Sequence, residues 1–172
     1  MLRIVTCSVL LAAATTVAAA EKPITAQATM RDASGTVVGS ATFTEKDDGV
    51  EVSVKVAGLP PGKHGIHLHE KGACDPPGFS TAGGHFNPTT KRHGAKNPEG
   101  KHAGDLPNLD VKPDGTGELT AVAAGATLSK GAASLLKEQG TALMIHAGPD
   151  DEKTDPSGNS GDRIACGIVI RK

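Results

Sequence analysis

The chain has 172 residues, and its 18 Lys and Arg nearly balance its 19 Asp and Glu. This balance argues against nucleic acid as a partner, which would need a strongly basic face. With 22 Gly, 11 Pro, three Phe and neither Trp nor Tyr, the core has to be built from small and aliphatic side chains. Such a composition favours one compact all-β domain rich in turns.

Residues 1–20 have the pattern of a cleavable secretory signal peptide. Arg3 gives a positive start, a largely apolar run follows, and residues 18–20 match the A-x-A cleavage motif. A membrane anchor is the alternative, although the apolar run is short for a bilayer span. We therefore expect an exported mature domain of residues 21–172 with no membrane association, periplasmic in a Gram-negative bacterium and otherwise extracellular.

Short apolar or alternating segments predict eight strands in the mature chain. The clearest is 50–56, where four valines alternate with polar residues and so share one face. The others are 24–30, 39–44, 65–70, 106–111, 118–124, 142–145 and 164–170. Only 132–139 suggests a helix, and a short one. Eight short strands separated by turns are typical of a β-sandwich or β-barrel.

The seven histidines are unevenly spread, since five of them lie within residues 67–105. His67 and His69 alternate with aliphatic residues in a predicted strand, so both imidazoles should point to the same face. His146 stands at the end of a later predicted strand. His64 should point away from this face, and we expect it to be exposed or bonded to backbone. Because histidine is the commonest metal ligand, the cluster predicts a metal site.

Four further candidate ligands lie in Gly- and Pro-rich sequence that predicts a loop: His85, His93, His102 and Asp105. Together with the three histidines on strands they make seven candidates, whereas two four-coordinate sites need eight donor positions. One imidazole serving both metals through its two ring nitrogens would close the count. Three His and one Asp suit zinc. A site made only of imidazoles suits copper, zinc, iron or nickel.

These motifs resemble those of the Cu/Zn superoxide dismutases. The order and spacing of four features match that family: the H-x-H strand, the G-H-F-N-P motif, the H-x7-H-x8-H-x-x-D run and the late histidine. The match extends from about residue 50 to the C-terminus. The resemblance implies an eight-stranded Greek-key β-barrel of immunoglobulin-like architecture, of which this family is a standard example. Long metal-binding and electrostatic loops would cover it.

The resemblance also implies one copper and one zinc per chain. Copper would be bound by His67, His69, His85 and His146, and zinc by His85, His93, His102 and Asp105. His85 would then be a bridging imidazolate.

Cys74 and Cys166 are the only cysteines after the predicted leader. An exported protein with two cysteines most simply forms one disulfide, and the family has one at matching positions. Arg163, three residues before Cys166, matches the family's active-site arginine. A fixed guanidinium beside the copper would attract and orient a small anion such as superoxide.

Asp150, four residues after His146, matches a family aspartate that would accept hydrogen bonds from His67 and His93 and so orient one ligand of each metal. The neighbouring carboxylates of Asp151, Glu152 and Asp155 are expected to form a plain acidic loop. The cations between His85 and His102, which are Lys91, Arg92, Lys96 and Lys101, are expected to be solvated.

The activity implied by the resemblance is an antioxidant one: two superoxide ions would become dioxygen and hydrogen peroxide as copper is alternately reduced and reoxidised. The alternative is an exported copper- or zinc-binding module without turnover, but such a relative should lack a copper ligand or the arginine. A purely structural zinc domain would leave His67, His69 and His146 without a purpose. Whether the protein is a monomer or a homodimer stays open.

Overall fold

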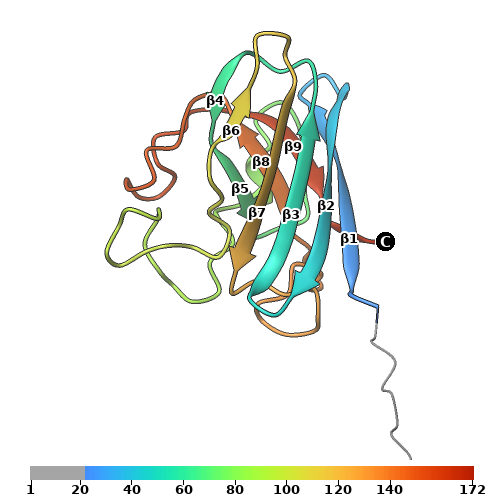
Figure 1. The fold of residues 1–172 in the computed structure, drawn as a ribbon, viewed down its shortest axis with the longest axis vertical. Helices are drawn as coiled ribbons and strands as arrows, with labels where there is room; N and C mark the ends of the chain where they lie inside the picture. The colour runs from blue at the N-terminus through green and yellow to red at the C-terminus, as the bar shows by residue number, and fades with distance from the viewer. Residues whose placement is uncertain (1–21) are drawn as a thin grey trace, which may run out of the picture.

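The computed structural model describes residues 22–172, so the predicted signal peptide, residues 1–20, lies outside the described residues. The described chain forms one antiparallel sheet curled into a nearly closed barrel (Figure 1), which confirms the predicted all-β fold. Its strands are β1 (Thr25–Asp32), β2 (Val37–Lys46), β3 (Gly49–Val56), β4 (Gly62–His64), β5 (Ile66–His69), β6 (Leu109–Val111), β7 (Gly117–Ala124), β8 (Ala142–His146), β9 (Arg163–Ile168) and β10 (Ile170–Arg171). Within these residues the one helix is a 3₁₀ turn, Ser80–Ala82.

The strand order β4-β6-β7-β3-β2-β1-β9-β8-β5, with β10 beside β1, reflects crossovers from β3 to β4, from β5 to β6 and from β7 to β8. Strand β3 shows why the sheet curls around a core. Its four valines, Val50 to Val56 in alternation, are buried, while Lys55 on the outer face pairs with Glu118 of β7. Alternation of apolar and polar residues therefore separates the core from solvent, as period-two patterning requires.

The predicted strand 65–70 is part of a longer extended run that forms two strands, because the run changes neighbours at Gly65. Before it β4 pairs with β6, and after it β5 pairs with β8, so this one run joins the two ends of the sheet. Gly65 donates its N–H to the Gly148 carbonyl and accepts from the His146 N–H, each at 2.8 Å. A Cβ at Gly65 would lie 2.7 Å from the Ser160 Cβ, so the crossing point requires glycine. Splits here and before β10 raise the strand number above the predicted eight.

The predicted helix at 132–139 is wrong, because this segment forms successive turns. Its Leu135 is fully buried in the barrel core, and its N–H donates to the Thr127 carbonyl at 2.8 Å. The Leu135 carbonyl accepts from the Thr141 hydroxyl at 2.8 Å. Burial of one leucine, with hydrogen bonds that do not have the spacing of a helix, outweighs the local helix propensity.

Two long loops lie against one side of the barrel, drawn in green and in orange-red at the left of Figure 1. We call residues 70–108 the metal loop and residues 147–162 the acidic loop. The predicted disulfide is confirmed: Cys74 and Cys166 are bonded, with their Cα atoms 5.7 Å apart, and they tie the metal loop to β9. No helix among residues 22–172 has the length and apolar character needed to span a membrane.

Candidate metal centre

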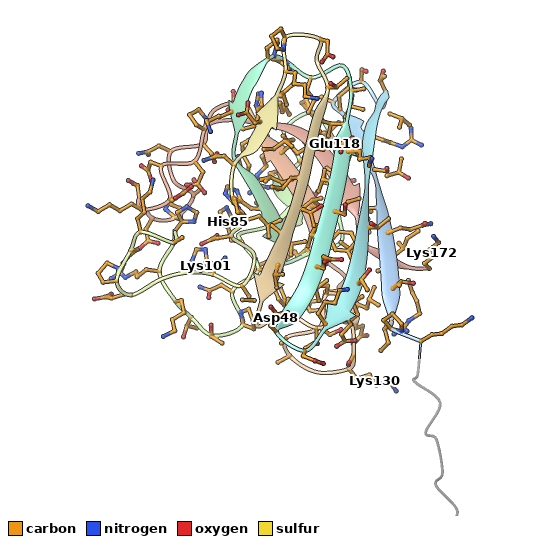
Figure 2. The ribbon with its side chains drawn as sticks, viewed as in Figure 1. Asp48, His85, Lys101, Glu118, Lys130 and Lys172 are labelled. Atoms are coloured by element: carbon orange, nitrogen blue, oxygen red, sulfur yellow. A yellow bond between two sulfur atoms is a disulfide. The ribbon has the colours of Figure 1, made fainter. Side chains whose placement is uncertain are left out.

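The first cluster of potential ligands combines two neighbouring strands and one loop. His67 and His69 project from β5, His146 ends the adjacent β8, and His85 comes from the metal loop. Each residue offers one ring nitrogen, and these four atoms lie within 4.8 Å of one another. His85 lies on the loop-covered side of the barrel (Figure 2). The H-x-H alternation therefore places both imidazoles outside the aliphatic core but under the loops.

In this cluster one ring nitrogen of each histidine is hydrogen-bonded and the other is buried without a partner. The bonded atoms are His67 Nε2 to Asp150 at 2.8 Å, His69 Nδ1 to the Gly83 carbonyl at 3.0 Å, His85 Nδ1 to Asp105 at 2.9 Å and His146 Nδ1 to the Gly161 carbonyl at 3.1 Å. The unpartnered atoms are His67 Nδ1 and the Nε2 atoms of His69, His85 and His146. A proton donated by each bonded nitrogen leaves a lone pair on the other, which is the arrangement of a metal ligand.

The pKa values of these imidazoles favour the neutral form that binds metal. Burial lowers the pKa of His69 to about 2, that of His67 to about 3 and that of His146 to about 4. Burial likewise lowers the pKa of His85. All four rings are therefore neutral near pH 7, so a cation does not have to displace protons from them.

The second cluster is centred on one carboxylate oxygen. Asp105 Oδ1 lies 2.9 Å from Nδ1 of His85 and 3.1 Å from Nδ1 of both His93 and His102. Its other oxygen accepts from the backbone N–H groups of Gly94 and His102, at 2.9 and 3.0 Å. Burial alone would raise the pKa of Asp105, but hydrogen bonds from the surrounding imidazoles hold it well below its ordinary value. This carboxylate is thus ionised and available to a cation.

Backbone pairing with β5 holds the metal loop in place. Leu68 of β5 donates its N–H to the Gly104 carbonyl at 2.9 Å, and its carbonyl accepts from the Phe86 N–H at 2.8 Å. These bonds place His85 and Asp105, the neighbours of Phe86 and Gly104, against the strand that carries the H-x-H motif.

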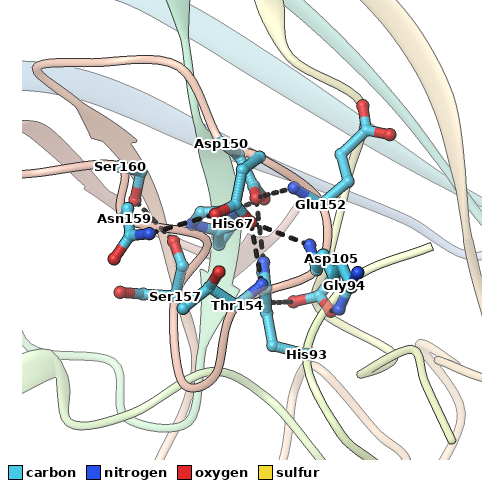
Figure 3. A network of polar contacts seen from close by, with 12 residues as sticks. His67, His93, Gly94, Asp105, Asp150, Glu152, Thr154, Ser157, Asn159 and Ser160 are labelled. Atoms are coloured by element: carbon cyan, nitrogen blue, oxygen red, sulfur yellow. Dashed lines mark hydrogen bonds and ion pairs between the residues drawn. The ribbon is translucent and has the colours of Figure 1, made fainter. Parts of the chain in front are cut away.

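Asp150 joins the two clusters (Figure 3). Its Oδ2 accepts from His67 Nε2 at 2.8 Å, and its Oδ1 accepts from His93 Nε2 at 2.9 Å. Asn108 fixes the Asp150 backbone through two hydrogen bonds of 2.8 and 2.9 Å. Burial acts against a charge on His93, but hydrogen bonds to Asp105 and Asp150 raise its pKa to about 9. In the metal-free protein His93 therefore carries a proton that a metal would have to displace.

Residues 37–169 match the family model described as copper/zinc superoxide dismutase (SODC). The chain belongs to this family. Cu-Zn superoxide dismutase 2 of Aquifex aeolicus is 48% identical over 146 residues, 84% of this chain and 85% of that protein. The superoxide dismutase-like protein YojM of Bacillus subtilis is 46% identical over 139 residues, 79% of this chain and 71% of that protein.

Solved structures agree with this assignment. A double mutant of a SOD-like protein from Bacillus subtilis superimposes with a TM-score of 0.80 at 44% identity, over 84% of this chain and 96% of that chain. Membership of the copper/zinc superoxide dismutase family implies copper and zinc, and both clusters described above fit such cations.

Arg163, the first residue of β9, lies in the wall of a hollow of about 450 Å³ that is also lined by Pro77, Gly78, Ser80, Gly161 and Asp162. Its guanidinium donates to the Phe79 carbonyl at 2.7 Å and to the Gly83 carbonyl at 2.6 Å. The Gly83 carbonyl also accepts from His69 Nδ1. Two backbone carbonyls therefore fix the arginine, and one of them, that of Gly83, also binds His69 of the first cluster.

His64 belongs to neither cluster. It is buried, with Nδ1 2.7 Å from the His146 carbonyl and Nε2 2.8 Å from the Pro60 carbonyl. Both ring nitrogens thus bond backbone carbonyls. The sequence led us to expect His64 to be either exposed or bonded to backbone, and the second placement is the one observed. The ring braces the crossing point between β4 and β5.

The expectation of a plain acidic loop is wrong for two residues. Asp155 accepts from the His93 backbone N–H at 2.6 Å and from the Arg92 guanidinium at 3.0 Å, and Glu152 pairs with Lys96 at 3.2 Å. Sequence reasoning missed them because these partners lie some 60 positions away, and no spacing motif links them. Asp151, by contrast, accepts hydrogen bonds only within its own loop among the described residues.

Proposed function

We propose that the protein is an exported superoxide dismutase that converts two superoxide ions and two protons to dioxygen and hydrogen peroxide. The observation that carries this proposal is the convergence of four unpartnered, buried imidazole nitrogens beside a second cluster of three histidines and one aspartate. His85 belongs to both clusters, so the two sites share one ring.

The donor sets suit different metals. In this proposal copper is bound by His67, His69, His85 and His146, whose donors are all imidazoles. Zinc is bound by His85, His93, His102 and Asp105, a set of three His and one Asp. One ion of each kind per chain uses all seven ligands.

When bound, copper supplies one-electron oxidation and reduction, while zinc supplies a fixed positive charge without redox change. The side chains supply the rest. The positive charge of Arg163 attracts and orients the superoxide anion near the first cluster, since the Gly83 carbonyl that its guanidinium binds also accepts from the copper ligand His69. His85 can carry a proton on Nε2 and hand it to the reduced oxygen species, because its Nδ1 faces the second cluster and the ring is held in place from that side.

A copper/zinc-binding module without turnover is not favoured. Such a protein would be expected to lack a copper ligand or the arginine, and here all seven ligands and Arg163 are present and close together.

The decisive experiment combines metal analysis with a superoxide-consumption assay on the purified mature protein. We expect equal copper and zinc and rapid turnover. His146→Ala should lose turnover and copper while keeping zinc, since His146 belongs to the first cluster alone. Bound copper and zinc with no superoxide consumption would refute the proposal.

Export is part of the proposal. Residues 1–20 are a signal peptide that is removed, so the mature domain begins at Glu21. The signal-like composition of these residues and a disulfide suited to an oxidising compartment both support it. N-terminal sequencing of the protein recovered from the periplasm or medium checks it, and an N-terminus at Met1 would contradict it.

A further inference from the structure

The acidic loop forms two exposed ion pairs with the metal loop. In one, Glu152 pairs with Lys96, and neither side chain touches a ligand of either cluster. In the other, Asp155 accepts from the backbone N–H of His93 and from the Arg92 guanidinium. The two carboxylates are similarly exposed, 29% for Glu152 and 33% for Asp155. They differ in their partners: Asp155 binds the backbone of a candidate metal ligand, His93, whereas Glu152 binds Lys96, which is not one.

His93 is consequently held at three points by three carboxylates. Asp150 binds the tip of the ring at Nε2, Asp105 lies 3.1 Å from Nδ1, and Asp155 binds the backbone N–H at 2.6 Å. The first two contacts orient the ring, and the third fixes the point on the main chain from which the ring projects. Movement of the His93 main chain away from the acidic loop breaks the bond to Asp155, so this bond opposes one route by which His93 leaves the second cluster.

We propose that Asp155 is a positioning residue for the zinc ligand His93, and that it slows the loss of zinc by tying the main chain of this ligand to the acidic loop. This inference rests on the zinc assignment of the proposed function. A partner that orients a metal ligand typically changes metal affinity by 10- to 100-fold when it is removed. The contribution of Arg92 is secondary, because its guanidinium is 62% exposed and binds the oxygen of Asp155 that does not face His93.

The test measures transfer of zinc from the metal-loaded mature protein to a chromophoric chelator, with release of copper followed separately. Asp155→Ala should release zinc about tenfold faster than the unsubstituted protein, and Asp155→Asn should be intermediate because its amide oxygen still accepts from His93. Glu152→Gln is the matched control, since it breaks the other ion pair between the same loops. Glu152→Gln and Arg92→Gln should both stay within about twofold of the unsubstituted protein.

Two readouts separate positioning from general loosening of the loops. Copper release and the unfolding temperature of the metal-free protein should be unchanged in Asp155→Ala. Zinc release within twofold of the unsubstituted protein would overturn the inference, and so would an equal effect of Glu152→Gln or a parallel loss of copper. Because zinc transfer needs no turnover, a protein that binds zinc without consuming superoxide would refute the proposed activity and still test Asp155. Failure of the unsubstituted protein to bind zinc would overturn both.

Discussion

Asp150→Asn should disable one of the two clusters through a change of tautomer. Both carboxylate oxygens of Asp150 accept, one from His67 Nε2 and one from His93 Nε2. An amide of the same shape has one acceptor and one donor. The ring that faces the donor has to move its proton from Nε2 to Nδ1, and Nδ1 is the atom through which His67 and His93 would bind metal. One cluster therefore loses a lone pair without any change in its own residues.

The size of the effect follows from the burial of this network. The side chains of His67 and His93 are fully buried and that of Asp150 is 2% exposed, so neither ring can replace the lost acceptor with bulk water. Loss of such a partner weakens metal binding by about 10- to 100-fold, and we expect this for one metal only. Asp150→Ala removes both acceptors and should weaken both metals. It should also lower the free energy of unfolding by about 2 to 6 kcal/mol, since each buried, unsatisfied donor costs about 1–3 kcal/mol.

The assay is metal content after dialysis against graded concentrations of chelator, for copper and zinc separately. Asp151→Asn is the control, because it makes the same chemical change in the same loop at a residue that contacts neither cluster. If Asp150→Asn retains both metals within twofold of the unsubstituted protein, the tautomer argument is wrong.

Three further predictions concern stability and the loop contacts. The metal-free protein should lose stability as pH falls below about 6.5, because the pKa of His69 is lowered to about 2 and the unfolded chain therefore binds more protons in this range. The pKa of His93 is raised to about 9, so the stability that its charged form contributes should be lost as pH rises from 6.5 through 9. Denaturant unfolding between pH 4 and 10 measures both effects, and a flat profile would contradict them. Replacing Cys74 and Cys166 by serine should lower the free energy of unfolding by about 4–5 kcal/mol, because the disulfide closes a loop with a separation of 92 residues. The reason would be wrong if the unsubstituted protein had the same free energy of unfolding with and without a reductant. Gly94→Ala should weaken zinc binding by more than tenfold in the chelator assay. Gly94 has φ +94°, and a Cβ there would overlap a backbone carbonyl of the acidic loop. Zinc binding within twofold of the unsubstituted protein would refute this reason.

Regular strands could be predicted from the sequence because their signal is local. Strand β3 alternates without interruption, and the structure reproduces it almost to the residue. The turns at 132–139 could not be predicted, because Ala, Leu, Lys and Glu favour a helix, and only the burial and the non-helical hydrogen bonds of Leu135 decide otherwise. The break at Gly65 was equally invisible, since it depends on which strand lies on either side.

The candidate ligands could be selected because imidazoles and their spacing are distinctive. Their grouping into two clusters came from family resemblance, and the structure brings the same residues together. Asp155 was missed for a physical reason. Its partner is a main-chain N–H, which every non-proline residue carries, so no side-chain pattern marks the contact.

The crossing point at Gly65 has a consequence for local opening of the barrel. The run from β4 to β5 joins the two end strands of the sheet directly, and two backbone hydrogen bonds at Gly65 hold it to the end of β8 and to the acidic loop. His67 and His69 follow this point on β5 and His146 ends β8, so an ion held between them would tie β5 to β8 beside Gly65. The amide hydrogens of Gly65 and His146 should then exchange with solvent deuterium as a pair, quickly in the metal-free protein and slowly once metal is bound.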